Sequence, residues 1–164
     1  MGYDELGYFV NTPDQVKVFP EVPALLQGYK YFLNWRIVGV SNQGGIALGH
    51  MSEEICDEAM KETNRQCCKR FDSIVWCPHH PASDDPVLGV ECWCRKPRIG
   101  MITGAARDLA RINNEFYAAN NCVFVGDRPE DEECAKNAGM DFLWAKDWRK
   151  GDHLNLMLAL GIGR

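Results

Sequence analysis

Residues 77–97, CPHHPASDDPVLGVECWCRKP, gather side chains that bind soft metal ions. Cys77 and His79 are separated by a single residue, as are Cys92 and Cys94, and a short loop joins the two pairs. Two such pairs can converge on one tetrahedral ion, giving it three thiolates and one imidazole. Because four protein ligands leave no coordination position for a catalytic water, the predicted zinc is structural. It would stabilise a loop that has few apolar residues.

Two alternatives stay open at this point. His80 is the other candidate ligand, although Cys-x-His mirrors Cys-x-Cys and favours His79. Disulfides are the other use of these thiols, but Cys92 and Cys94 are awkward partners for each other. A reducing compartment also disfavours any disulfide.

The other cysteines show no metal-ligand spacing. Eight cysteines would indicate a disulfide framework in a small secreted domain, but this chain is long for that class and shows no export signal. We therefore predict small buried side chains or surface thiols. These cysteines are Cys56, Cys67, Cys68 and Cys134, in helix-like stretches, and Cys122, which opens an apolar run.

Two cations follow the last predicted zinc ligand. A rigid metal site would hold the backbone of Arg95 and Lys96 in one place. Lysine suits a phosphate as a compact point charge, and arginine suits a sugar or phosphate oxygen through its forked guanidinium. The alternative is a solvated charge pair on a loop.

The sequence SNQGG, after an apolar run, offers groups that bind anions. Ser41 supplies a hydroxyl, Asn42 and Gln43 supply side-chain amides, and Gly44 lets backbone N–H groups approach a ligand. Glycine-rich turns after strands are common, so this signal is weak alone.

The third segment with polar groups suited to a phosphate site is GDRPEDEE. Asp127 ends an apolar run there, and Asp131 follows four residues later. A hard ion such as Mg²⁺ takes one or two such carboxylates together with substrate oxygens. A favourable helix N-terminus is the alternative for Asp131 and is our interpretation of Glu130, Glu132 and Glu133. Hydroxyl, amides, lysine and carboxylate together indicate a phosphoryl-transfer site.

The elements that must position these groups alternate between short apolar runs and amphipathic stretches. Apolar rather than alternating strands favour an α/β fold, a three-layer parallel sheet with helices on both faces and ligands at the carboxyl ends of the strands. We predict strands at 16–18, 36–40, 73–76, 122–127 and 142–144, and helices at about 20–34, 52–70, 101–112, 129–139 and 153–160.

Length and composition favour one domain spanning residues 1–164, with a zinc loop at about 77–97. The net charge of −5 argues against nucleic acid or an anionic membrane as the main partner. No apolar run is long enough to span a bilayer, and the first residues lack the features of a signal peptide, so we expect a cytoplasmic location. Oligomeric state stays open.

Three segments resemble one known family: VGVSNQGGIALG, CPHHP to CWCRKPRIGM, and VGDRPEDEECAKNAG. They are similar to the D-glycero-D-manno-heptose 1,7-bisphosphate phosphatases, which are related to histidinol-phosphate phosphatases within the haloacid dehalogenase (HAD) superfamily. The similarity covers about residues 7–145. It implies a Rossmann-like sheet, Mg²⁺-dependent hydrolysis of a phosphate monoester, and a zinc loop on the four ligands named above.

The resemblance also implies roles for individual residues. Ser41 and Lys96 would steady the phosphoryl group, Arg95 would help to choose the substrate, and Asp127 would bind Mg²⁺. Arg128 stands where the family often has a substrate-contacting lysine, so the charge is kept while the shape changes.

One family motif has no counterpart in this sequence. Members carry an apolar strand ending in Asp-x-Asp-Gly-Thr, whose first Asp attacks phosphorus and whose second moves the proton. Asp4 has no strand before it and no Gly-Thr after it, and Asp14 lies beside Pro13 in a predicted turn. The motif's strand would lie between the predicted strands 36–40 and 122–127, at the centre of the sheet.

We consider three explanations for this gap. The natural protein begins further upstream, the two flanking strands pair directly, or another chain supplies the strand. The expected function is therefore that of a HAD-type sugar-phosphate phosphohydrolase whose nucleophile is absent and whose activity is low. A non-catalytic, zinc-stapled protein that binds sugar phosphates is the alternative.

Overall fold

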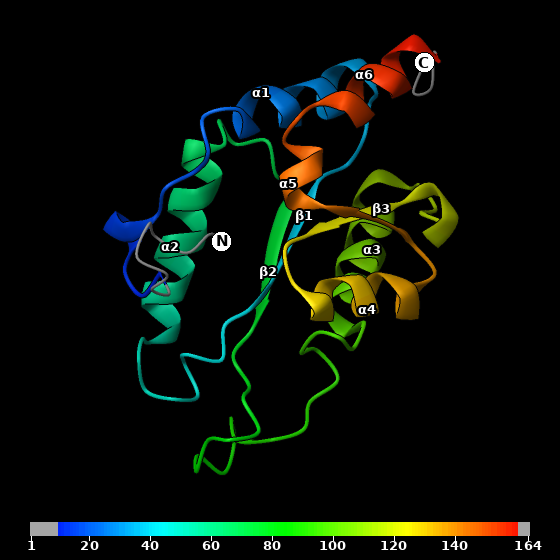
Figure 1. Ribbon diagram of the computed structural model, residues 1–164. Helices are drawn as coiled ribbons and strands as arrows, with labels where there is room; N and C mark the ends of the chain where they lie inside the picture. The colour runs from blue at the N-terminus through cyan, green and yellow to red at the C-terminus, as the bar shows by residue number, and fades with distance from the viewer. Residues whose placement is uncertain (1–9, 161–164) are drawn as a thin grey trace.

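The computed structural model describes residues 10–160, which fold into helices and short parallel strands (Figure 1). The strands are β1 (Val38–Asn42), β2 (Ser73–Cys77), β3 (Val123–Gly126) and β4 (Asp141–Trp144). The α-helices are α1 (Val22–Gln27), α2 (Glu53–Gln66), α3 (Gly100–Asn113), α4 (Pro129–Ala138), α5 (Ala145–Trp148) and α6 (Asp152–Ala159). Three shorter helical segments are η1 (Pro13–Gln15), η2 (Gly28–Phe32), which is a π-helix, and η3 (Ala119–Asn121).

The strands form two separate parallel pairs. β1 pairs with β2 from Val38↔Ser73 to Asn42↔Cys77, and β3 pairs with β4. The predicted combination of helices and parallel strands is confirmed. The strands of residues 10–160 form two pairs, and no strand in that range lies between β1 and β3, where the resemblance places the strand of the absent motif. Direct pairing of β1 with β3 is likewise not seen there.

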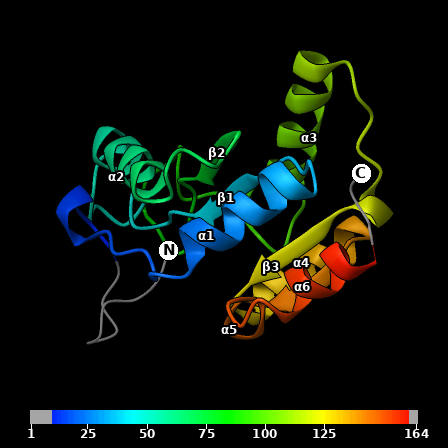
Figure 2. The ribbon, with the colours of Figure 1, turned by 90° about the horizontal axis from the view of Figure 1, so that it is seen from above.

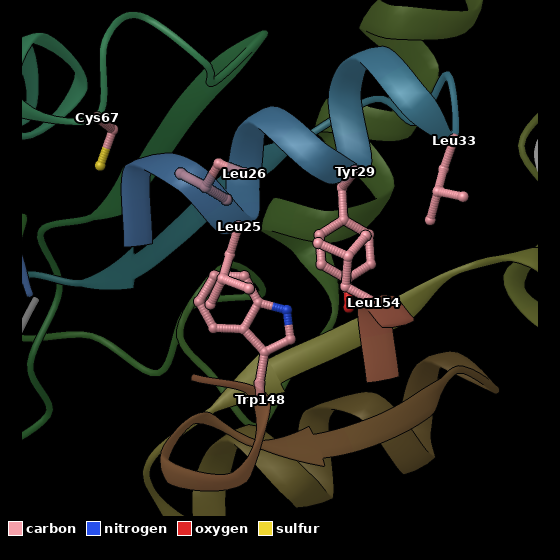
Figure 3. Close-up of a cluster of buried hydrophobic side chains, with 7 residues drawn as sticks. All are labelled: Leu25, Leu26, Tyr29, Leu33, Cys67, Trp148 and Leu154. Carbon is pink, nitrogen blue, oxygen red and sulfur yellow. The ribbon is translucent and has the colours of Figure 1, made fainter. Parts of the chain in front are cut away.

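The two pairs are joined by packed side chains rather than by backbone hydrogen bonds. Figure 3 shows Leu25, Leu26 and Tyr29, from α1 and η2, packed near Trp148 and Leu154 of the C-terminal helices. This cluster lies at the end of the molecule where β1 begins (Figure 1). At a second junction, Val40 of β1 packs against the cluster of buried residues around Phe124 of β3.

Local signals placed most elements correctly. Ser52 caps α2, because its Oγ accepts a hydrogen bond from the Ile55 N–H, as expected for an N-cap serine. α4 begins at Pro129 and ends before Gly139, whose φ of 70° is the left-handed conformation that glycine adopts readily. These boundaries confirm the predicted ones.

Three local predictions need correction. The strand predicted at 16–18 does not form, because the Gln66 side chain donates to the Val16 carbonyl (2.8 Å) and accepts from the Val18 N–H (3.0 Å). These two bonds take the place of a neighbouring strand. α2 ends four residues before the predicted Arg70, and Ile112, predicted on the packed face of α3, is 74% exposed.

Candidate functional site

The predicted phosphate-handling residues surround one cavity of about 1120 Å³. β1 contributes all of its residues to the wall, β3 contributes Val123–Val125, and α3 contributes Ile102, Ala105, Ala106 and Leu109. The predicted site residues that line it are Ser41, Asn42, Gln43, Gly44, Arg95, Lys96, Asp127 and Arg128. Three separate loops therefore converge at the carboxyl ends of β1 and β3.

Lys96 is the most constrained cation of this site. Its side chain is only 11% exposed, and its Nζ lies 2.6 Å from Asp131 Oδ1 and 3.2 Å from the Val40 carbonyl oxygen. The ammonium also lies 5.9 Å from the centre of the Phe124 ring, within the range of a cation–π contact. Lys96 thus connects β1 with the β3–α4 segment.

Asn42 holds the backbone of Lys96. The Asn42 Oδ1 accepts the Lys96 N–H at 2.9 Å, and its Nδ2 donates to the Lys96 carbonyl at 3.1 Å. Both bonds cross 54 residues of sequence. The side chain predicted to bind substrate is therefore engaged in positioning the lysine.

Asp131 was not among the predicted site residues, although its spacing from Asp127 had been noted. It is 3% exposed, and its Oδ2 accepts the backbone N–H groups of Asp127 and Arg128, both at 3.1 Å. Its other oxygen makes the ion pair with Lys96, at an orientation outside hydrogen-bond geometry. A methyl group on Gly126 would lie 2.3 Å from the Asp131 Cβ, so only glycine fits at that position. Asp131 thus places a buried negative charge beside the Lys96 ammonium and holds the backbone at the start of α4.

The SNQGG turn packs tightly against the cysteine-rich segment. Gln43 is buried; its Nε2 donates to Ser41 Oγ at 2.6 Å and its N–H to the Cys77 carbonyl at 2.7 Å. A methyl group on Gly44 would lie 2.7 Å from His80 and 3.0 Å from Arg95 Nη1. The backbone of this turn therefore approaches both side chains closely, as the glycine suggested.

His80 and Arg95 form the wall beside that turn. The His80 Nδ1 accepts the Ala82 N–H at 3.2 Å, and Arg95 Nη1 donates to the His79 carbonyl at 3.1 Å. Burial, followed by the neighbouring Arg95 charge, lowers the pKa of His80. His80 thus lines the cavity beside Arg95, a position that spacing did not indicate.

Asp127 fits the predicted magnesium position. It directly follows β3, is exposed and lines the cavity, and among the described residues no donor is hydrogen-bonded to its carboxylate. One free carboxylate beside space for substrate oxygens matches the way Mg²⁺ is commonly held. Arg128, next to it, lies 3.6 Å from Glu130 Oε1.

The four predicted zinc ligands converge in space. The sulfurs of Cys77, Cys92 and Cys94 lie 2.9–3.4 Å apart, and His79 Nδ1 lies 3.3 Å from Cys94 Sγ and 3.5 Å from Cys77 Sγ. All four ligand atoms lie within 4.8 Å of one another. Zn–S bonds of about 2.3 Å in a tetrahedron place sulfurs about 3.8 Å apart, so a small expansion of this cluster accommodates the ion.

This geometry also decides between the alternatives left open by the sequence. His79, not His80, joins the cluster, and the sulfurs are too far apart for a disulfide bond of about 2.05 Å. Burial raises the pKa of the Cys77 thiol, so a cation is needed before this group ionises at neutral pH. The donor set, three thiols and one imidazole, suits zinc.

Comparison of the sequence and the fold with known proteins identifies the protein family. A family profile described as HAD-hydrolase-like matches residues 93–147. The solved structure of a D,D-heptose 1,7-bisphosphate phosphatase from B. bronchiseptica, in complex with magnesium and phosphate, superposes with a TM-score of 0.63 at 28% identity, covering 82% of this chain and 69% of that one. A HAD-like protein from Mesorhizobium loti shares the fold at 22% identity (TM-score 0.74; 94% and 79% covered). The chain belongs to the HAD-like hydrolases.

Two curated relatives are similar to this chain in sequence. A D-glycero-beta-D-manno-heptose-1,7-bisphosphate 7-phosphatase from Vibrio cholerae is 38% identical over 123 residues, covering 73% of this chain and 61% of the relative. The histidine biosynthesis bifunctional protein HisB from Legionella pneumophila is 33% identical over 144 residues, covering 85% and 37%. This chain therefore spans only about 40–60% of the length of these relatives.

The predicted class and the resemblance are thus confirmed, and Asp4, considered and rejected as a nucleophile, lies outside the described residues. Within residues 10–160, no helix is both long enough and apolar enough to cross a bilayer.

Proposed function

We propose that this chain supplies the phosphate-binding part of an Mg²⁺-dependent phosphohydrolase that acts on a small sugar phosphate of the heptose 1,7-bisphosphate type. The observation that carries the proposal is the position of Lys96 in a cavity that Ser41 and Asp127 also line. Its nearly buried ammonium contacts the Val40 carbonyl and Asp131, and Asn42 holds its backbone. A fixed cation in a partly dry cavity interacts strongly with a phosphoryl group.

The polar residues at the carboxyl ends of the strands have separate roles in the proposed reaction. Lys96 opposes the negative charge on the phosphoryl oxygens, and the Ser41 hydroxyl donates a hydrogen bond to one of them. Arg95 and Arg128 also line the cavity and contact the rest of the sugar phosphate, Arg95 through its forked guanidinium.

Asp127 would hold the magnesium ion together with substrate oxygens. When bound, the ion supplies a positive charge that neutralises the phosphoryl oxygens during transfer. The zinc, held by Cys77, His79, Cys92 and Cys94, has a different role. It fixes the segment from which Arg95 and Lys96 project.

The attacking carboxylate comes from outside residues 10–160. In the reaction that the resemblance implies, a carboxylate oxygen bonds to phosphorus as the ester P–O bond breaks, and a second acid protonates the departing sugar hydroxyl. Water then cleaves the acyl phosphate to release inorganic phosphate and restore the carboxylate. Of the described carboxylates near the cavity, Asp127 and Asp131 have other roles, and Glu115 and Glu130 are paired with arginines.

The test is a comparison of binding with turnover. With Mg²⁺ present, inorganic phosphate should bind to the zinc-loaded chain. Lys96→Met should weaken this binding at least tenfold. Lys61→Met, which changes an exposed lysine on α2, should leave it unchanged. Hydrolysis of heptose 1,7-bisphosphate by this chain should be slow or absent. It should rise when an Asp-x-Asp-Gly-Thr strand is added ahead of Met1. Phosphate binding that is unchanged in Lys96→Met would refute the proposal.

The second candidate, a non-catalytic sugar-phosphate-binding protein, rests on one observation. Among the described carboxylates that line the cavity or contact Lys96, only the predicted magnesium ligand has no partner, since Glu115 is paired with Arg36, Glu130 with Arg128 and Asp131 with Lys96. Tight binding of the sugar phosphate, with no turnover even after the strand is added, would favour this candidate.

A further inference from the structure

His80 is a polar residue of the cavity wall that the proposed reaction does not use. It directly follows the candidate zinc ligand His79 and lies in the loop that joins β2 to α3. Figure 1 shows this loop at the end of the molecule opposite α1 and α6, and in Figure 2, seen from above, those two helices lie in front. His80 is therefore placed with the carboxyl ends of β1 and β2, where the phosphate is proposed to bind.

The backbone of His80 is fixed by its own loop. Its N–H donates to the Leu88 carbonyl at 3.0 Å, and its carbonyl accepts the Ser83 N–H at 3.0 Å. Leu88 in turn packs against the buried cluster around Ile46, and the Ser83 hydroxyl donates to the Ala47 carbonyl. These contacts hold His80 beside the turn that follows β1.

The imidazole of His80 has one nitrogen engaged and one free. The Nδ1 accepts the Ala82 N–H at 3.2 Å, so this nitrogen carries no proton and the ring proton is on Nε2. Among residues 10–160 no group is hydrogen-bonded to Nε2, and this atom is not enclosed by other protein atoms. Nε2 is therefore a neutral N–H donor that a ligand can reach.

This donor lies next to Arg95 and the glycine turn. A Cβ on Gly44 would lie 2.7 Å from His80 Cδ2, the carbon bonded to Nε2, and 3.0 Å from Arg95 Nη1. His80 and Arg95 thus form one stretch of the cavity wall. The guanidinium supplies the charge of that wall, and the imidazole supplies an uncharged donor.

The chemistry of the donor indicates which part of a ligand it meets. Lys96 and Arg95 supply the positive charge that phosphate oxygens need, and a neutral N–H adds little beside two full charges. The same N–H suits a hydroxyl oxygen, which is uncharged and accepts one hydrogen bond readily. A polar wall of this kind also discriminates, because a ligand without the hydroxyl leaves the donor unpaired.

We propose that His80 determines ligand specificity, with its Nε2–H donating to a hydroxyl oxygen of the sugar while Lys96 holds the phosphate. The inference rests on the proposed function, because it takes the position of the phosphate from Lys96. It narrows the ligand class to phosphate esters of polyhydroxylated alcohols, which should bind more tightly than alkyl phosphates without a hydroxyl. His80 contacts the sugar and takes no part in phosphoryl transfer.

The test measures three affinities of the zinc-loaded chain with Mg²⁺ by titration calorimetry, for inorganic phosphate, ethyl phosphate and D-mannose 6-phosphate. His80→Phe keeps an aromatic ring against Gly44 and removes the donor. It should weaken binding of mannose 6-phosphate about three- to tenfold, the range for one neutral hydrogen bond, and leave the other two affinities unchanged.

Two further variants separate recognition from packing. His80→Gln offers an amide N–H in place of the imidazole and should restore part of the affinity for mannose 6-phosphate. His153→Phe is the matched control, because this histidine lines the cavity from α6, and it should change none of the three affinities. Circular dichroism verifies that each variant folds.

The specificity of His80 and the proposed function fail in different ways. Equal weakening of all three ligands by His80→Phe, or an unchanged affinity for mannose 6-phosphate, would overturn the role of His80. Equal affinity of the unmodified chain for mannose 6-phosphate and ethyl phosphate would overturn it without any variant. Absence of inorganic phosphate binding by the unmodified chain, or unchanged binding in Lys96→Met, would instead overturn the proposed function.

Discussion

Removing the Asp131 carboxylate tests whether Lys96 is held as the structure indicates. In Asp131→Ala, the Lys96 ammonium, 11% exposed, loses its counter-charge at 2.6 Å, and the backbone N–H groups of Asp127 and Arg128 lose their acceptor. Breaking a buried ion pair on one side costs roughly 3–5 kcal/mol, against a total stability of about 5–15 kcal/mol. We therefore expect a large fall in the free energy of unfolding, measured by denaturant titration of the zinc-loaded protein.

A double-mutant cycle separates the ion pair from the other losses. Lys96→Met should also destabilise, and the double variant should be less destabilised than the two single effects added together, by about 1–3 kcal/mol. Lys150→Met is the control, because its partner Asp147 and the lysine itself are exposed, and it should leave stability unchanged. Additive single effects, or a loss from Asp131→Ala that occurs only in the presence of Mg²⁺, would refute this reasoning and make Asp131 a magnesium ligand.

Three further predictions follow from the same structure. Chelating the zinc should lower the unfolding temperature and expose Cys92 to iodoacetamide, whereas Cys68, already exposed, should react equally with and without chelator. Asn42→Ala should weaken phosphate binding several-fold, as titration calorimetry would show, because Lys96 loses both backbone restraints; an unchanged affinity would contradict this. Burial lowers the pKa of His153 in the folded protein. Below about pH 6.5 the unfolded state therefore binds more protons than the folded state. The free energy of unfolding should fall as the pH drops through the folded-state pKa. Thermal melts from pH 7.5 to 5 should show this fall, and His153→Gln should remove part of it.

The sequence predicted those features whose causes are local. The limits of α4 follow from Pro129 and Gly139, and each half of the metal centre is a pair of ligands one residue apart, so folding had only to bring two pairs together. The gap between the two strand pairs was predicted only through the family resemblance, whose central strand has no counterpart in the sequence, and not from local patterns. It depends on which strands find partners, and apolar runs of similar character carry no information about pairing.

Residue roles in the cavity were harder to predict than residue positions. Asn42 was expected to face a ligand because its type and its loop suit that use. Its actual partner, the backbone of Lys96, lies 54 residues away and is set by packing. Asp131 was noted only for its spacing from Asp127, and nothing in the sequence indicated that its carboxylate would be paired with Lys96.

The four candidate zinc ligands and the proposed phosphate-binding residues are linked by short contacts, which accounts for the order of residues in the cysteine-rich segment. The Arg95 N–H donates to Cys92 Sγ at 3.3 Å, and Lys96 follows the ligand Cys94 by two residues. Asn42 fixes the same stretch from β1, so Lys96 is held from the metal side and from the strand side. A lysine with a long flexible side chain becomes a fixed charge only under such restraints. With zinc bound as proposed, the ion would hold the two cations in the cavity, which accounts for their place directly after the ligands.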